Sequence, residues 1–279
     1  VRTNFEGLVI QPGMTGIEVV EDSNDHAVVK VGASENWDTW VGLTMDRGWY
    51  GLENLSMIPG SVGSSPIQNI GAYGVELKDR FAWLEAWNLT EQKMDRLNLE
   101  ACHFGYRNSI FKNEASGRYI ITHVAFSLSK KPDLQLNYGN VREEFINVNG
   151  LSPSDLREVI SSIRKAKLPD PEQHGNAGSF FKNPLVDKTI YNCIRVEYPE
   201  VPFFPQEDNQ MKIPAAWLIE KAGWKGKRIG NVGTWPSQAL VIVNFGEATG
   251  QEIFDFSEKI IEDVEQKFGV TLEREVNVI

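Results

Sequence analysis

The chain has 279 residues, which at about 150 residues per domain predicts two domains. Hydrophobic residues make up 41% and charged residues 24% of the sequence, close to the globular average, which excludes disorder, collagen and coiled coil. With 28 basic and 38 acidic side chains the net charge is −10, which argues against a general nucleic-acid binder. Cys102, Cys193 and four scattered histidines form neither a disulfide framework nor a metal motif, so we expect a reducing, cytoplasmic compartment and no metal.

The first half of the chain is predicted to be rich in strands. A helix beginning at Ser34 is indicated by apolar side chains at helical spacing, and Gly48 ends it. Between residues 51 and 74 the many glycines favour backbone that approaches something closely over regular structure. The expected elements are, in order, a strand at His26–Val31, the helix with Trp37, Trp40, Val41 and Thr44, a hairpin of Phe81–Leu89 with Met94–Leu97, and a half-buried strand at Val124, Phe126 and Leu128.

The second half begins with a helix that Ser152 caps and Pro169 and Pro171 end. The prolines indicate a domain junction, so the fold is predicted to be α+β in two parts that divide near residue 168. No apolar run approaches the ~20 residues of a membrane-spanning helix. The expected elements are the helix with Leu156, Val159, Ile160 and Ile163, a helix near Pro214–Ala222, a strand at Leu240–Asn244, a helix at Gln251–Phe268 burying Ile253, Phe254, Phe256, Ile260, Ile261, Val264 and Phe268, and a last strand at Glu275–Ile279.

Four segments have residue types that can support chemistry. The loop from Ile58 to Gly74 suits an anionic or planar ligand if its main-chain N–H groups face outward; otherwise it is a tight packing loop. Arg107 is either a clamp for a carboxylate or part of a structural ion pair. Ser179, in a predicted tight turn, is a candidate proton donor or a capping serine. Glu275 is either a buried acid or a solvated charge.

Taken together, seven segments in order resemble the UDP-N-acetylenolpyruvoylglucosamine reductase (MurB) family along the whole chain. Residues 137–139 also resemble the tyrosine-bearing loop of its type I subgroup. The resemblance implies a flavin-binding domain of the p-cresol methylhydroxylase and vanillyl-alcohol oxidase type, followed by an α/β substrate domain. The segments are Gly51–Leu55, Ile58–Glu76, Tyr106–Lys112, Lys167–Pro171, Gly175–Pro184, Ala215–Glu220 and Leu272–Val276.

The resemblance implies FAD-mediated, NADPH-dependent reduction of an enolpyruvyl UDP-sugar to UDP-N-acetylmuramate, a step of peptidoglycan synthesis. It implies that Ser179 donates a proton while Arg107 and Glu275 flank the substrate carboxylate. The implied cofactor-binding residues are Ser61, Gly63, Ser64, Ser65, Asn69, Gly71, Tyr73 and Gly74, and the implied substrate-binding residues are Tyr138, Lys167 and Asn183, with Arg164 and Gln238 as looser matches.

The implied organisation is a flavin-binding domain at 1–168, a substrate-binding domain at 169–270 and a C-terminal strand at 271–279 that returns to the active site; a monomer is expected. Two positions depart from the family pattern. Asn277 stands where many members have a basic residue, and no Gly-x-Gly-Ser-Asn pyrophosphate loop occurs. We therefore expect a late start, an unpaired sheet edge at Val1–Ile10 and weak FAD binding by residues 1–279 alone.

Two other functions are compatible with the same residues. One is a different oxidase or dehydrogenase on the same flavin fold, against which the segment Gly178–Pro184 argues. The other is a cofactor-free module that only binds a sugar nucleotide, which the missing pyrophosphate loop favours.

Overall fold

The computed structural model describes residues 7–8, 10–150, 152–206 and 208–278. The expected unpaired sheet edge at Val1–Ile10 concerns mostly residues 1–6 and 9, which lie outside the described residues. The chain divides into two compact units, Val9–Arg164, here called the N-terminal unit, and Lys165–Ile279 together with Val1–Leu8, here called the C-terminal unit. Among the described residues no helix is long and apolar enough to cross a membrane.

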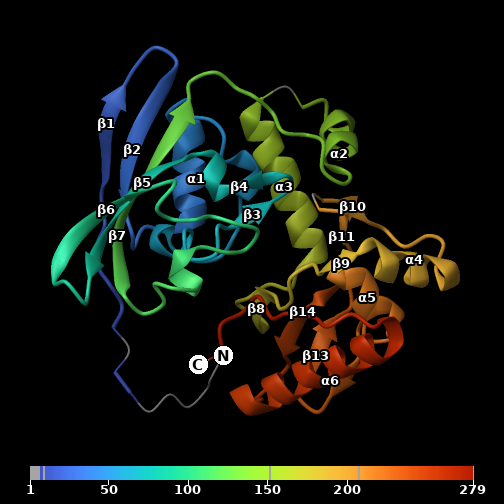
Figure 1. The fold of residues 1–279 in the computed structure, drawn as a ribbon. Coiled ribbons are helices and arrows are strands. Elements are labelled where there is room, and N and C mark those ends of the chain that lie inside the picture. Colours follow the sequence, from blue (N-terminus) through green and yellow to red (C-terminus); the bar gives the residue numbers. More distant parts are fainter. Residues whose placement is uncertain (1–6, 9, 151, 207, 279) are drawn as a thin grey trace. The chain divides into compact units, whose positions relative to one another are not determined.

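The N-terminal unit is built on an antiparallel five-stranded sheet (Figure 1). Its core lies where α1 (Trp37–Asp46) packs on the sheet, because the rings of Trp37 and Trp40 lie 5.9 and 5.5 Å from the ring of Phe126. The strands in spatial order are β1 (Ile17–Asp22), β2 (His26–Gly32), β7 (Tyr119–Ser129), β5 (Phe81–Asn88) and β6 (Lys93–Asn98).

Most predictions for this unit are confirmed, with two corrections. The strand at β2, the β5–β6 hairpin and the apolar face of α1 are as expected. The helix does not begin at Ser34, however: Asn36 caps it by accepting the N–H of Thr39, while the Ser34 hydroxyl donates to the carbonyl of Pro12. In β7, Ala125 is also buried, so the strand is covered on both faces at its centre rather than half-buried.

Two helices and the glycine-rich loops complete the N-terminal unit. The predicted Ser152 cap is confirmed, since the Ser152 hydroxyl accepts the N–H of Asp155 at 3.2 Å. Residues 51–80 contain only short pieces, as expected: 3₁₀ turns at Glu53–Leu55, Val62–Ser64 and Leu77–Asp79, and the strands β3 (Gly71–Ala72) and β4 (Val75–Glu76). The helices α2 (Val141–Asn147) and α3 (Pro153–Lys167) share a small core of Val141, Phe145, Leu156, Val159, Ile160 and Ile163.

The C-terminal unit contains a four-stranded antiparallel sheet packed on two helices, and a smaller three-stranded sheet (Figure 1). The four-stranded sheet has the order β12 (Arg228–Ile229), β13 (Val232–Trp235), β14 (Gln238–Asn244), β8 (Gly175–Ser179), and the smaller one β10 (Phe204–Pro205), β11 (Gln210–Lys212), β9 (Leu185–Asp187). The helices are α4 (Lys188–Glu197), α5 (Ala215–Lys221) and α6 (Gly250–Phe268).

Predictions for this unit are confirmed for α5, β14 and α6 and need correction at the chain's end. Gly269 ends α6 with a left-handed φ of 65°, and a capping box of Thr249 with Glu252 begins it. On α6, Phe254 and Ile261 are only partly buried. The described residues of the last segment contain no strand; only Arg274 makes an isolated bridge, to Phe181, and Ile279 lies outside the described residues.

The two units confirm the predicted α+β class, with antiparallel sheets and separate helices in each. The boundary between them falls between Arg164 and Lys165, within α3. The finer division into domains at 1–168, 169–270 and 271–279 stays a prediction, apart from the corrected last strand.

Candidate active site

The cofactor loop, residues 61–74 of the N-terminal unit, uses many of its main-chain donors internally. The N–H of Gly63 donates to the Ala33 carbonyl at 2.8 Å, and that of Ser61 donates to the Ser64 hydroxyl at 3.2 Å. The N–H groups of Ser64 and Ser65 close the 3₁₀ turn. A Cβ at Gly63 would lie 2.5 Å from that of Ala33, so close packing alone explains this glycine. These four amides do not face outward as a phosphate cradle would require.

Two polar side chains of the cofactor loop are buried and form hydrogen bonds that stabilise the loop. Asn69 is 0% exposed; its Nδ2 donates to Glu76 and to the Gly105 carbonyl, both at 3.0 Å, and its Oδ1 accepts the N–H of Lys78. The buried Ser65 hydroxyl donates to the carbonyl of Val62 at 2.6 Å. Both residues therefore shape the loop from within, and their direct contact with a cofactor stays a prediction.

Arg107 lies against the cofactor loop. Its backbone is left-handed, with a φ of 51°, and its Nη2 donates to the carbonyl of Gly71. A Cβ at Gly71 would lie 2.8 Å from Nη1 of Arg107, so the glycine leaves room for the guanidinium. The structure thus places Arg107 beside the loop that the resemblance assigns to the cofactor.

Tyr73, Tyr138 and Arg164 form a second group in the same unit. The Tyr73 ring meets the Tyr138 ring edge-on at 6.1 Å, and the Arg164 guanidinium is close enough to the Tyr73 hydroxyl to interact with it electrostatically. Burial raises the pKa of the Tyr73 hydroxyl and lowers that of the Arg164 guanidinium. Nε of Arg164 is buried with no hydrogen-bond partner in the part of the chain that the structure describes. An unsatisfied cationic donor beside the cofactor loop fits an electron-rich ligand such as a flavin.

Ser179 and Glu275 come together in the C-terminal unit through backbone pairing. Phe180 donates its N–H to the Leu240 carbonyl at 2.8 Å, and its carbonyl accepts the N–H of Glu275 at 2.9 Å. Glu275 is partly buried and Ser179 is exposed. The two predicted catalytic residues therefore occupy neighbouring backbone segments of one unit.

Ser179 ends a strand, which corrects the predicted tight turn. On β8, Asn176 opposes Val243 and Ser179 opposes Val241, so three steps on β8 match two on β14. This is a β-bulge, and Gly178 has the positive φ of 71° that a bulge often requires. Bulges re-aim side chains next to active sites, and the glycine directly before Ser179 was the sequence signal for one.

The remaining predicted substrate residues are dispersed over the C-terminal unit. Asn183 accepts the N–H of Ala215 at 2.9 Å and so caps α5. Gln238 pairs with Trp235 in the β13–β14 hairpin, and Lys167 is the exposed last residue of α3. The structure thus divides the predicted site residues between the units: Arg107, Tyr138, Arg164 and the cofactor loop in one, and Ser179, Glu275, Lys167, Asn183 and Gln238 in the other.

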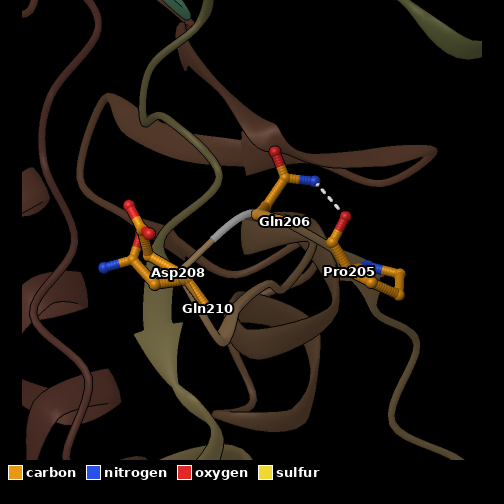
Figure 2. A pocket seen from close by; sticks show the side chains of 4 residues that line it. All are labelled: Pro205, Gln206, Asp208 and Gln210. Carbon is orange, nitrogen blue, oxygen red and sulfur yellow. Dashed lines mark hydrogen bonds between the residues drawn. The ribbon is translucent and has the colours of Figure 1, made fainter.

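A pocket also opens at the β10–β11 connection of the C-terminal unit (Figure 2). It is lined by Pro205, Gln206, Asp208 and Gln210, and Gln206 donates from its side chain to the Pro205 carbonyl at 2.7 Å. The predicted site residues are not among these four. The pocket therefore adds nothing to the candidate site.

Comparison with known proteins gives two family matches. Residues 2–92 match the FAD binding domain family, and residues 170–279 match the family described as UDP-N-acetylenolpyruvoylglucosamine reductase, C-terminal domain. The matches cover parts of both units.

Curated proteins named UDP-N-acetylenolpyruvoylglucosamine reductase are similar along the chain. That of Flavobacterium johnsoniae is 43% identical over 279 residues, covering 99% of this chain and 83% of the relative. That of Pseudomonas aeruginosa is 47% identical over 277 residues, covering 99% and 81%. The crystal structure of the reductase from Thermus caldophilus has a TM-score of 0.59 at 24% identity, covers 89% of this chain and 71% of its own, and shares the fold.

Proposed function

Since the chain belongs to the UDP-N-acetylenolpyruvoylglucosamine reductase family, we propose that it converts the enolpyruvyl ether of UDP-N-acetylglucosamine to UDP-N-acetylmuramate with electrons from NADPH. It is thus an FAD-dependent oxidoreductase of peptidoglycan synthesis, and we propose that it works in the cytoplasm as a monomer. The observation that carries the proposal is the hydrogen bond from the N–H of Glu275 to the carbonyl of Phe180, the residue that directly follows the exposed Ser179.

FAD is the proposed cofactor, supported by the match of residues 2–92 to an FAD binding domain. When bound, it supplies the two-electron carrier between NADPH and the carbon–carbon double bond. Tyr73 and Arg164 would hold it, because the unsatisfied Nε of Arg164 is a donor that an electron-rich ring or an anionic group satisfies. The cofactor loop, shaped by Asn69 and Ser65, would present the main chain of residues 71–74.

Proton donation is the proposed task of Ser179. Reduction of the double bond requires one carbon to receive a proton, and the Ser179 hydroxyl carries one at an exposed position. Hydride addition to the other carbon puts negative charge on the carboxylate side of the substrate until the proton arrives, and there the Arg107 guanidinium can donate two parallel hydrogen bonds. Glu275 assists if it shares a proton in a hydrogen bond, since a bare carboxylate would repel that charge.

The nucleotide part of the substrate is the proposed ligand of a set of polar side chains. Lys167, as an exposed cation, suits a diphosphate, and Tyr138, Asn183 and Gln238 can donate hydrogen bonds to it or to the sugar. Arg164, like Gln238, is a looser match to the family pattern, and its guanidinium already interacts electrostatically with the Tyr73 hydroxyl.

Two measurements test the function. Added FAD should bind to the protein and show the visible absorbance of a bound flavin. Beyond the one equivalent of NADPH that reduces the flavin, NADPH oxidation should match the enolpyruvyl UDP-sugar supplied, one for one. A colourless protein that cannot be loaded with FAD would contradict the flavin proposal. A flavoprotein that oxidises NADPH but leaves this substrate unchanged would contradict the substrate proposal.

A further inference from the structure

The segment Gly51–Leu55, whose motif belongs to the family pattern, has no role in the proposed chemistry. It forms a tight turn: both carboxylate oxygens of Glu53 accept the N–H of Gly51, at 3.0 and 2.9 Å, and the Ser56 hydroxyl donates to the Glu53 carbonyl. These contacts fix the backbone on both sides of Asn54, which is only 2% exposed. The segment therefore holds one buried carboxamide in a fixed position.

The Asn54 carboxamide joins two loops that are distant in sequence. Its Nδ2 donates to the carbonyl of Tyr73 at 2.9 Å and to the carbonyl of Gln135 at 2.8 Å. The two acceptors lie 19 and 81 positions away along the chain. Both hydrogens of one NH₂ group are thus used, one on each loop, and no other side-chain type of this size provides two such donors.

Each of the two loops ends at a residue of the candidate site. Tyr73 belongs to the cofactor loop and has a left-handed φ of 49°, a conformation that costs free energy in a tyrosine. Gln135 lies three residues before Tyr138. The loops meet there: a Cβ at Gly74 would lie 3.6 Å from that of Tyr138, and the two tyrosine rings are in edge contact.

We propose that Asn54 is a positioning residue that sets the substrate-binding Tyr138 against the cofactor loop at Tyr73. The inference rests on the proposed function for the ligand of Tyr138, but the link between the loops is in the structure itself. Without the carboxamide, two carbonyl groups in partly buried surroundings lose their donor, and each loop relaxes. The left-handed Tyr73 then loses a contact that offsets its backbone cost.

The test compares Asn54→Leu with Asn88→Leu in the full chain loaded with FAD. Asn88 is a matched control: it is 0% exposed in the same unit, but its carboxamide bonds only within or beside the β5–β6 hairpin, to Asp95, Thr90 and Glu91 among others. Amide hydrogen exchange is measured on peptides that cover residues 70–76, 133–140 and 88–95. Asn54→Leu should accelerate exchange in the first two together by about tenfold, and Asn88→Leu only in the third.

Steady-state kinetics supply the second readout. Asn54→Leu should raise KM for the enolpyruvyl UDP-sugar by about tenfold, which corresponds to about 1.4 kcal/mol of binding. Asn88→Leu should leave that KM within about twofold. Asn54→Gln, which keeps the NH₂ group on a longer stem, should restore part of the loss, whereas Asn54→Asp, which has no NH₂, should not.

The outcomes separate the two proposals. If the wild-type chain turns over no enolpyruvyl substrate, the proposed function fails, while coupled exchange of the two loops still supports the role of Asn54. Unchanged exchange in 70–76 and 133–140 in Asn54→Leu would overturn that role whatever the activity. So would an equal rise in KM for Asn88→Leu, because general destabilisation would then explain the effect.

Discussion

The two units hold their parts of the candidate site by different kinds of contact. In the C-terminal unit, backbone pairing places Ser179 and Glu275, through the carbonyl of Phe180 and the N–H of Glu275. In the N-terminal unit, side chains hold backbone carbonyls: Asn69 holds Gly105, and Arg107 holds Gly71. A substitution at Ser179 or Glu275 therefore removes a functional group and leaves the backbone pairing, whereas one at Asn69 or Arg107 also removes a hydrogen bond that supports the backbone.

Ser179→Ala gives the largest expected effect. Because backbone pairing holds this position, the variant should fold and be reduced by NADPH at nearly the wild-type rate. Transfer to the substrate should slow by about 10⁴-fold, or about 5 kcal/mol of barrier, because Ser179 is the proposed proton donor. Rapid-mixing kinetics of the two half-reactions measure this, with the exposed Ser237→Ala as control. Equal slowing of both half-reactions would refute the role of Ser179.

Arg107 and Glu275 should be strongly non-additive across the two units. Each alanine variant should lower kcat/KM by about 10²–10³-fold. The double variant should lose much less than the product, because both residues are proposed to act on one developing charge. Arg96→Ala with Glu273→Ala, also one from each unit, should be additive within about 0.5 kcal/mol. Additivity of the first pair to the same precision would mean that the two residues act independently.

Loss of a supporting side chain should destabilise the N-terminal unit more than the C-terminal unit. Asn69→Ala leaves buried groups unsatisfied in the cofactor loop and should cost about 2–3 kcal/mol, whereas Asn183→Ala, which removes a helix cap, should cost about 1 kcal/mol. Urea midpoints of the full chain measure both, with the exposed Asn24→Ala as control. If Asn69→Ala costs no more than Asn24→Ala, side-chain support of the loop is refuted.

Glu53 should give the smallest effect, visible only as a change with pH. Burial raises the pKa of its carboxyl, although the N–H of Gly51 and the charge of Arg80 oppose this. The folded chain therefore retains this proton to higher pH than the unfolded chain. The resulting stability is complete below the unfolded pKa and is lost as pH rises through the folded pKa.

Glu53→Gln keeps an acceptor for Gly51 and has no proton to lose. Its urea midpoint should therefore rise relative to wild type between about pH 4 and pH 8, starting from the smallest difference at the acid end. A difference that is constant across this range, or that falls, would contradict the raised pKa.

Elements with strong local signals could be predicted from the sequence. The apolar spacing of α1, α3 and α6, the glycine at the end of α6 and the hairpin of β5 with β6 all depend on neighbouring residues. β8 could not, because Gly175–Ser179 consists of small and polar residues with little strand preference; it is extended because β14 pairs with it. The strand predicted for Glu275–Ile279 was wrong for the opposite reason. Its apolar residues favour a strand, but the described residues of this segment lack the continuous pairing of one.

The candidate site shows the same limit. The resemblance named Ser179, Glu275 and Arg107, but no local pattern showed that Phe180 would pair with Glu275. The bonds of Asn54 to Tyr73 and Gln135 depend on three segments meeting, so its motif was visible and its contacts were not. The unsatisfied Nε of Arg164 likewise follows from burial in the folded unit.

In the segment between α6 and Glu275, the number of residues matters more than the type of each side chain. Gly269 ends the helix, Val270 and Leu272 insert into the core, and Arg274 is held by Ser257 and by Glu258 on α6. Removal or insertion of one residue here would move the N–H of Glu275 away from the Phe180 carbonyl, because Val270, Leu272 and Arg274 fix the chain before it. Substitutions at exposed positions such as Thr271 would be tolerated. We therefore expect relatives to have the same number of residues in this segment, while the exposed residues differ from one relative to another.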